Sequence, residues 1–117
     1  MQFSLAANYD LNLVPEMAKY PVIDVYGKLQ SDLVGGGRPS FSSTKITLTH
    51  LEKYIKALNK HNIHFTYLLN SSCLANREFD RRWQKKLFKF LNKLKDINVT
   101  RLTVSTPLLF KIIKKNF

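Results

Sequence analysis

The stretch that decides the fold is FDRRWQKKLFKFLNKLKDINVTRLTVST, residues 79–106. Its apolar side chains recur at intervals of three and four: Trp83, Leu87, Phe90 or Leu91, Leu94 and Ile97. This spacing predicts an amphipathic helix from about Phe79 onward. Asn98 and the β-branched Val99 follow, and Leu102–Thr106 has the composition of a strand. The stretch therefore contains a helix, an asparagine junction and a strand.

The same unit occurs once earlier in the chain. Leu51, Tyr54, Ile55 and Leu58 stand at positions i, i+3, i+4 and i+7, which predicts a helix with one apolar stripe. We expect Thr49 and Glu52 to begin this helix as a capping box. Asn62 then occupies the left-handed position at which helices often end, and Ile63–Leu69 is the next predicted strand.

Working outward, the remaining segments extend the alternation. Phe3–Ala7 reads as a buried strand, Leu11–Tyr20 as a helix and Val22–Tyr26 as a second strand. Pro107 ends the fourth strand, and a fourth helix covers Leu108–Lys115. We expect an α/β fold of four βα units, with residues 1–117 forming a single domain.

Two architectures fit four βα units. One is the first half of a (β/α)8 TIM-like barrel, since a whole barrel takes about 250 residues. The alternative is a small open parallel sheet. In both, the loops that follow the strands converge at one end of the sheet, where ligands bind. The loop at residues 27–43 is unusually long for such a connection, which indicates a functional or disordered segment.

Composition restricts the class of protein. The chain of 117 residues carries 19 Lys and Arg against 8 Asp and Glu, a formal net charge of +11, which attracts phosphates, anionic surfaces or acidic partners. RNA contact is one interpretation, and a hydrated surface is the other. A run of about 20 apolar residues and a signal peptide are both missing from the sequence, so we expect a cytoplasmic protein without a membrane partner.

Three segments that follow predicted strands resemble the peptidase U32 family, the collagenase-like proteases. They are Asn8-Tyr9-Asp10, the long segment Val25–Leu29 with Ser31–Ser40, and Tyr67–Asn70 with Ser72–Leu74 and Asn76–Phe79. The resemblance covers nearly the whole chain and implies the start of the family's N-terminal barrel. It also implies a hydrolase in a bacterial or archaeal cytoplasm, and other members support RNA or quinone hydroxylation.

The family's downstream cysteine-rich signature has no counterpart in the sequence, which contains a single cysteine. The expected function is therefore a truncated peptidase-like barrel fragment that contributes part of a substrate-binding mouth and is inactive alone. The alternative is a basic RNA-associated module, or a subunit linked to RNA or quinone hydroxylation. We expect no cofactor in this chain, although family members carry an iron–sulfur cluster through those downstream cysteines.

The candidate substrate-binding residues all follow predicted strands: Asn8, Lys28, Arg38, Asn70, Ser72, Cys73, Asn76 and Arg77. Gly35–Gly37 allows the backbone to approach a ligand, and Arg38 is suited to clamping a carboxylate or phosphate. The catalytic residues are not assigned, and no residue is expected to bind metal.

Each candidate also has a purely structural interpretation. We favour Cys73 as a structural, partly buried thiol over a nucleophile, because no histidine is expected near it. Asn76 and Glu78 suit the capped start of the following helix, and the lysines of that helix suit its hydrated outer face. Expected partners are a C-terminal half or separate polypeptide, or a second copy joined through open strand edges.

Overall fold

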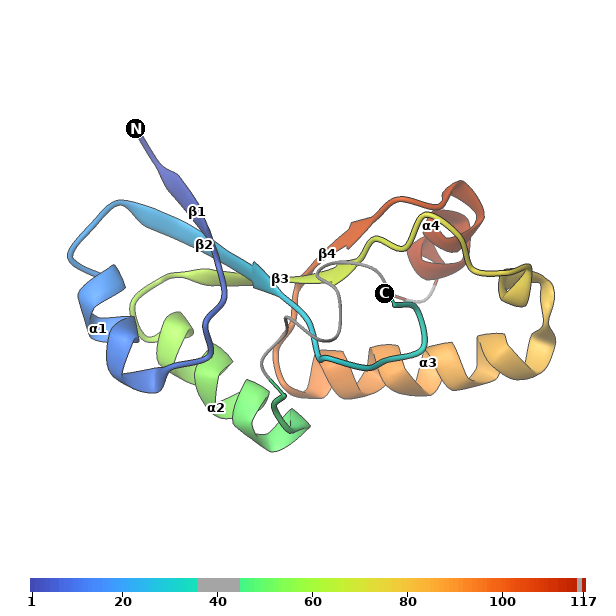
Figure 1. Ribbon diagram of the computed structural model, residues 1–117, viewed down its shortest axis with the longest axis horizontal. Helices are drawn as coiled ribbons and strands as arrows, with labels where there is room; N and C mark the ends of the chain where they lie inside the picture. The colour runs from blue at the N-terminus through green and yellow to red at the C-terminus, as the bar shows by residue number, and fades with distance from the viewer. Residues whose placement is uncertain (36–44, 116) are drawn as a thin grey trace.

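The computed structural model describes residues 1–35, 45–115 and 117 (Figure 1). Its four strands are β1 (Phe3–Ala6), β2 (Val22–Gly27), β3 (His64–Leu69) and β4 (Arg101–Val104). The helical elements are η1 (Leu11–Leu13), α1 (Val14–Met17), α2 (Leu48–Asn59), η3 (Arg77–Phe79), α3 (Arg81–Asp96) and α4 (Pro107–Lys114). Strands and helices alternate along the chain, as the sequence predicted.

All strand pairs are parallel, and the sheet order is β1-β2-β3-β4. The sheet is open, with β1 and β4 at its two edges. This confirms the predicted α/β class with four βα units. Such a sheet is consistent with half of a barrel and with a small open parallel sheet.

The core lies between one face of the sheet and helices α2 and α3. Val25, Phe65, Tyr67 and Leu69 project from β2 and β3 and are buried. They meet the predicted helix stripes, which are also buried: Leu51, Tyr54, Ile55 and Leu58 on α2, and Trp83, Leu87, Leu91 and Leu94 on α3. Burying each such aliphatic side chain contributes about 1.5–3 kcal/mol. In Figure 1, α1, α2 and α3 lie along one side of the sheet.

The opposite face of the sheet carries polar side chains. Asp24 accepts hydrogen bonds from Ser4 Oγ (3.1 Å) and Thr66 Oγ1 (2.7 Å), and its Oδ1 lies 3.9 Å from Arg101 Nη1. These four residues come from the four strands and form one diagonal row across the sheet, because Ser4 pairs in register with Asp24 and Thr66 with Arg101, whereas Asp24 pairs with His64. Tyr26, His64 and Thr103 on the same face are exposed, so helices cover one face of the sheet only.

The two asparagine junctions are confirmed. Asn62 and Asn98 have φ angles of 59° and 68°, the left-handed conformation that ends a helix. After each asparagine, the next amide reaches back to the helix: Ile63 N to Leu58 O at 3.1 Å, and Val99 N to Leu94 O at 2.9 Å. Two equivalent helix ends therefore deliver the chain into β3 and β4.

Both predicted helix caps were wrong. Thr47, in extended conformation, caps α2 by accepting a bond from His50 N at 3.1 Å, while Thr49 lies inside the helix. Asp80 caps α3 by accepting from Arg82 N at 2.8 Å. Asn76, the predicted cap, cannot cap α3 because the turn η3 separates it from that helix. In each case a nearby polar residue with suitable backbone geometry takes the cap.

Two further expectations need correction at the N-terminus. Strand β1 was predicted to be buried, but Phe3, Ser4 and Leu5 are exposed because β1 is an edge strand with a neighbour on one side only. The helix predicted over Leu11–Tyr20 is shorter, consisting of the turn η1 followed by α1. None of the helices in residues 1–35 and 45–115 is long and apolar enough to cross a membrane.

Candidate functional site

An enclosed ion pair lies just beyond the carboxyl end of β2. Lys28 Nζ is 3.1 Å from Asp32 Oδ2 and 3.2 Å from Asp32 Oδ1. The side chains are 9% and 1% exposed, so both charges are almost removed from water. An isolated charge at such a position would be costly, and each of these charges compensates the other.

Asp32 organises the first part of the long β2–α2 loop. Its Oδ1 accepts hydrogen bonds from Val34 N at 3.0 Å and Gly35 N at 2.8 Å, and its Oδ2 accepts one from the Tyr67 hydroxyl at 2.6 Å. Lys28 Nζ also donates to the carbonyl oxygen of Gly35. Gly35 has φ of 74°, a conformation that glycine adopts without strain. The carboxylate thus fixes the backbone up to Gly35.

Tyr9 joins the β1 loop to the same cluster. Its hydroxyl accepts from Lys28 N at 2.8 Å and donates to Lys28 O at 2.7 Å. A Cβ atom on Gly27 would overlap this hydroxyl, so glycine is required there by close approach. On the other side, His50 Nε2 lies 2.7 Å from Tyr9 O, which ties the start of α2 to the β1 loop.

The buried tyrosines have strongly shifted acidities. Burial, and then the neighbouring Asp32 carboxylate, raise the pKa of the Tyr67 phenol well above its ordinary value. Tyr67 therefore remains a hydrogen-bond donor to Asp32 at neutral pH. Burial, with a smaller effect from Tyr9, raises the pKa of Tyr54 to about 12. The Tyr54 hydroxyl is buried and makes no hydrogen bond of normal geometry within the described residues, although the backbone amides of Asn8 and Tyr9 lie close enough to lower its pKa against the effect of burial.

The loop after β3 forms a second polar segment at the same end of the sheet. The carbonyl oxygen of Ser71 accepts hydrogen bonds from Ser105 Oγ at 2.9 Å and Thr106 Oγ1 at 3.0 Å, which link this loop to the end of β4. Ala75 and Asn76 are both left-handed, with φ of 53° and 61°. Ala75 is strained there because its Cβ disfavours that region.

Cys73 and Arg77 both lie on the outside of this loop. The structure corrects the expectation of a partly buried thiol, since Cys73 is exposed. Its sulfur accepts a bond from Ala75 N at 3.4 Å, and no histidine pairs with it among the described residues. Arg77 is exposed and uses Nε to donate to Leu74 O at 2.9 Å. Its two terminal nitrogens have no partner within the described part of the chain.

The remaining candidates are distributed along the same end of the sheet. Ser72 is exposed, and Asn70 is half-buried with its Oδ1 atom enclosed and unpaired among the described residues. Asn8 is exposed and accepts from Asp10 N at 3.1 Å, a local turn contact. Arg38 lies outside the described residues, as does most of the segment Gly35–Ser40.

Sequence reasoning singled out Lys28 but missed the residues that hold it. Asp32 stands in the quoted motif, and Tyr9 and Tyr67 also lie in resembling segments, yet nothing in their spacing shows that they meet. A usable signal is their position in the predicted fold. Tyr9 and Asp32 lie in segments that follow predicted strands, and Tyr67 lies near the carboxyl end of one, where parallel strands bring their loops together.

The residues present do not suit a cluster cofactor. Iron–sulfur clusters are held by several cysteine thiolates, and the sequence has Cys73 alone. Within residues 1–35 and 45–115, no group of three or more His, Cys, Asp or Glu side chains could hold a metal ion.

No protein-family model matches the chain. Among curated proteins, the chain is 27% identical over 110 residues to an uncharacterized protease of Methanocaldococcus jannaschii. The alignment covers 89% of this chain and 33% of that protein, so the chain spans about a third of the length of its curated relative. The identity and the coverage mark a distant similarity. The name of the relative states neither a substrate nor a mechanism.

Proposed function

We propose that this chain is a peptidase-like barrel fragment of the U32 type that forms part of a substrate-binding mouth. The observation that carries the proposal is the enclosed Lys28–Asp32–Tyr67 cluster, because it fixes the beginning of the glycine-rich loop at the carboxyl ends of β2 and β3. Parallel α/β proteins bind their ligands at that end. The distant similarity to a protein named as a protease agrees with it.

In this proposal the cluster positions the mouth and does not itself bind substrate. Both oxygens of Asp32 accept bonds within the protein, and Lys28 Nζ is directed to Asp32 and Gly35. Substrate contact then belongs to exposed groups nearby, namely the Ser72 hydroxyl and the terminal nitrogens of Arg77, which have no partner among the described residues. We assign Arg38 to the same mouth from its place in the sequence alone. A guanidinium group binds a peptide carboxylate through paired charged hydrogen bonds.

The catalytic step is assigned to additional polypeptide. The exposed Cys73 lacks a base among the described residues, so the described part of the chain shows no activated nucleophile. The chain spans a third of its relative, which leaves room in a protein of that kind for the missing groups. We place the protein in the cytoplasm as part of this proposal.

Binding of a fluorescent gelatin-derived peptide with a free carboxylate, followed by anisotropy, tests the proposal. Arg77→Ala and Arg38→Ala should each weaken binding about 10-fold or more, since a hydrogen bond to a charged group contributes about 1.5–3 kcal/mol. Arg82→Ala is the matched control, because Arg82 is an exposed arginine on α3. Equal affinity in all four proteins would place the mouth elsewhere.

A second candidate function follows from the surface of α3. Arg82, Lys85, Lys86, Lys89 and Lys93 are all exposed on this helix, as the sequence predicted. A basic strip on a chain with a charge of +11 suits RNA phosphates. RNA binding that weakens with salt and disappears when these lysines become glutamine would favour this function over the peptide-binding mouth.

A further inference from the structure

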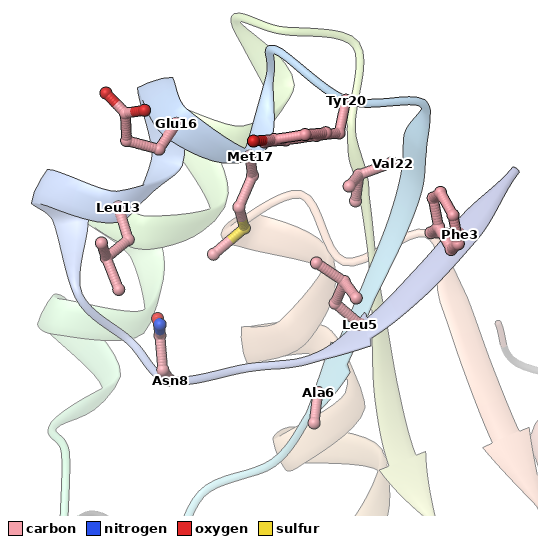
Figure 2. A pocket seen from close by; sticks show the side chains of 9 residues that line it. All are labelled: Phe3, Leu5, Ala6, Asn8, Leu13, Glu16, Met17, Tyr20 and Val22. Atoms are coloured by element: carbon pink, nitrogen blue, oxygen red, sulfur yellow. The ribbon is translucent and has the colours of Figure 1, made fainter.

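The edge strand β1 and helix α1 flank an apolar groove (Figure 2). Its volume is about 470 Å³, and its apolar lining includes Phe3, Leu5, Leu13, Met17, Tyr20 and Val22. Phe3, Leu5, Leu13 and Tyr20 are exposed, so the groove opens to solvent beside the unpaired edge of β1. A contiguous apolar patch at an open strand edge is typical of an interaction site.

The opposite edge of the sheet presents a complementary element. Helix α4 follows the second edge strand, β4, and buries Leu109 and Ile113 against the core. Phe110 on the same helix is 54% exposed, and Lys114 Nζ lies 6.0 Å from the centre of its ring. The aromatic side chain and neighbouring lysines face away from the core, while Glu16 contributes an acidic group to the lining of the groove.

The sheet also leaves one face without a covering layer. All-parallel sheets occur almost only with both faces covered. Here the second face carries the diagonal row Ser4, Asp24, Thr66 and Arg101. The Asp24 side chain in this row is only 13% exposed although no helix covers it. A hydrogen-bonded polar row of this kind tolerates enclosure, because its groups already have partners.

We propose that the groove receives α4 of a second copy of this chain, whose β4 adds to β1 as a parallel strand. A crossover helix packs over its own strand and the strand beside it, and among the described residues β4 has a neighbour on one side only. In the proposed pair, β1 of the other copy is the strand beside β4. When α4 and β4 of the first copy also meet the groove and β1 of the second copy, the two sheets close into one eight-stranded parallel barrel. The face of each sheet that no helix covers then points into the barrel.

A second copy is the occupant because groove and insert lie on the same chain, at opposite edges of one sheet. Such a head-to-tail contact forms either a closed ring or an open fibre. Four strands from each copy are enough to close a small barrel, which removes every exposed strand edge. The inference is independent of the peptide-binding mouth, since that mouth is tested through Arg77 and this contact through residues at the sheet edges.

Sedimentation equilibrium over a range of concentrations tests the proposal. The wild-type chain should form dimers and no larger species, and dimerisation should strengthen as salt screens the repulsion between two chains of charge +11. Phe110→Asp and Leu5→Asp should each weaken dimerisation at least 10-fold. Phe79→Asp is the matched control, because Phe79 is 68% exposed in η3, outside the groove. Circular dichroism confirms that each variant is folded.

A mixing experiment identifies the direction of the contact. The Leu5→Asp chain keeps a normal α4, and the Phe110→Asp chain keeps a normal groove. In a mixed dimer of the two chains, one of the two contacts therefore joins a normal α4 to a normal groove. The mixture should therefore dimerise at concentrations at which each variant alone is monomeric. A wild-type chain that stays monomeric at millimolar concentration would overturn the proposal, and so would a Phe110→Asp chain that dimerises normally or a mixture that remains monomeric.

Discussion

The hydroxyl of Tyr67 donates a 2.6 Å hydrogen bond to the carboxylate of Asp32, 35 residues earlier in the chain. This contact attaches the loop that follows β2 to the neighbouring strand β3. Because Asp32 also pairs with Lys28 and accepts two backbone amides, it is the point at which strand, loop and ion pair meet. The order of the β2–α2 loop up to Gly35 therefore depends on one buried carboxylate.

Asp32→Ala should destabilise the fold strongly. The change leaves the Lys28 ammonium enclosed without its partner, and breaking a buried ion pair from one side costs about 3–5 kcal/mol. Urea unfolding followed by circular dichroism measures the loss. Asp96→Ala, an exposed aspartate at the end of α3, is the control and should change stability by less than about 0.5 kcal/mol. A similar small change for Asp32→Ala would show that the pair contributes little.

Tyr54→Phe and Tyr67→Phe should have different effects on stability although each removes one buried hydroxyl. The Tyr54 hydroxyl makes no hydrogen bond of normal geometry among the described residues, so its removal should change stability little. The Tyr67 hydroxyl bonds Asp32 and accepts from Leu29 N at 3.1 Å, so its removal should cost about 1–3 kcal/mol. Equal midpoints of urea unfolding for the two variants would contradict this distinction.

Stability should fall in alkaline solution because of the same tyrosines. Their pKa values are raised in the folded state, to about 12 for Tyr54, so the folded protein holds these protons where the unfolded chain has lost them. The stabilisation that these bound protons contribute is complete below about pH 10, the ordinary tyrosine pKa, and declines as the pH rises above that value. Unfolding free energies at pH 8 to 11 measure the slope. Tyr54→Phe should make the slope shallower, and Tyr20→Phe, an exposed control, should not.

Gly27→Ala should destabilise the protein through a clash with Tyr9. The added methyl group meets both the Tyr9 hydroxyl and the Ala7 side chain, and overpacking of this kind costs about 1–3 kcal/mol. Tyr9→Phe removes the nearer atom, so the double variant should lose less stability than the sum of the two single changes. Strict additivity in thermal or urea unfolding would show that the two positions do not interact.

Cys73 should behave as an ordinary surface thiol. We expect it to react with a thiol reagent in the native state about as fast as in urea, since it is exposed and no histidine pairs with it among the described residues. Anaerobic reconstitution with iron and sulfide should yield no stable brown species. A cluster that survives desalting, or peptide cleavage that Cys73→Ala abolishes, would refute the assignment of this chemistry to other polypeptide.

Much of the fold follows from local patterns in the chain. The apolar spacing of Leu51–Leu58 and Trp83–Leu94 identified both long helices and their buried faces, because helix periodicity is a short-range property. Asn62 and Asn98 located two helix ends for the same reason. The caps were less predictable, since Thr47 and Thr49 are both suitable residues and the backbone geometry decides between them.

The site depended on contacts that no local pattern contains. The sequence by itself determined the alternation of strands and helices, the excess of positive charge and the polar residues that follow each strand. Only the tertiary structure brought Tyr67 to Asp32 and Tyr9 to Lys28, left β1 exposed at the edge and opened a groove beside α1. The physical reason is that these contacts join residues 19 or more positions apart, and the parallel pairing of β1, β2 and β3 sets which of them meet.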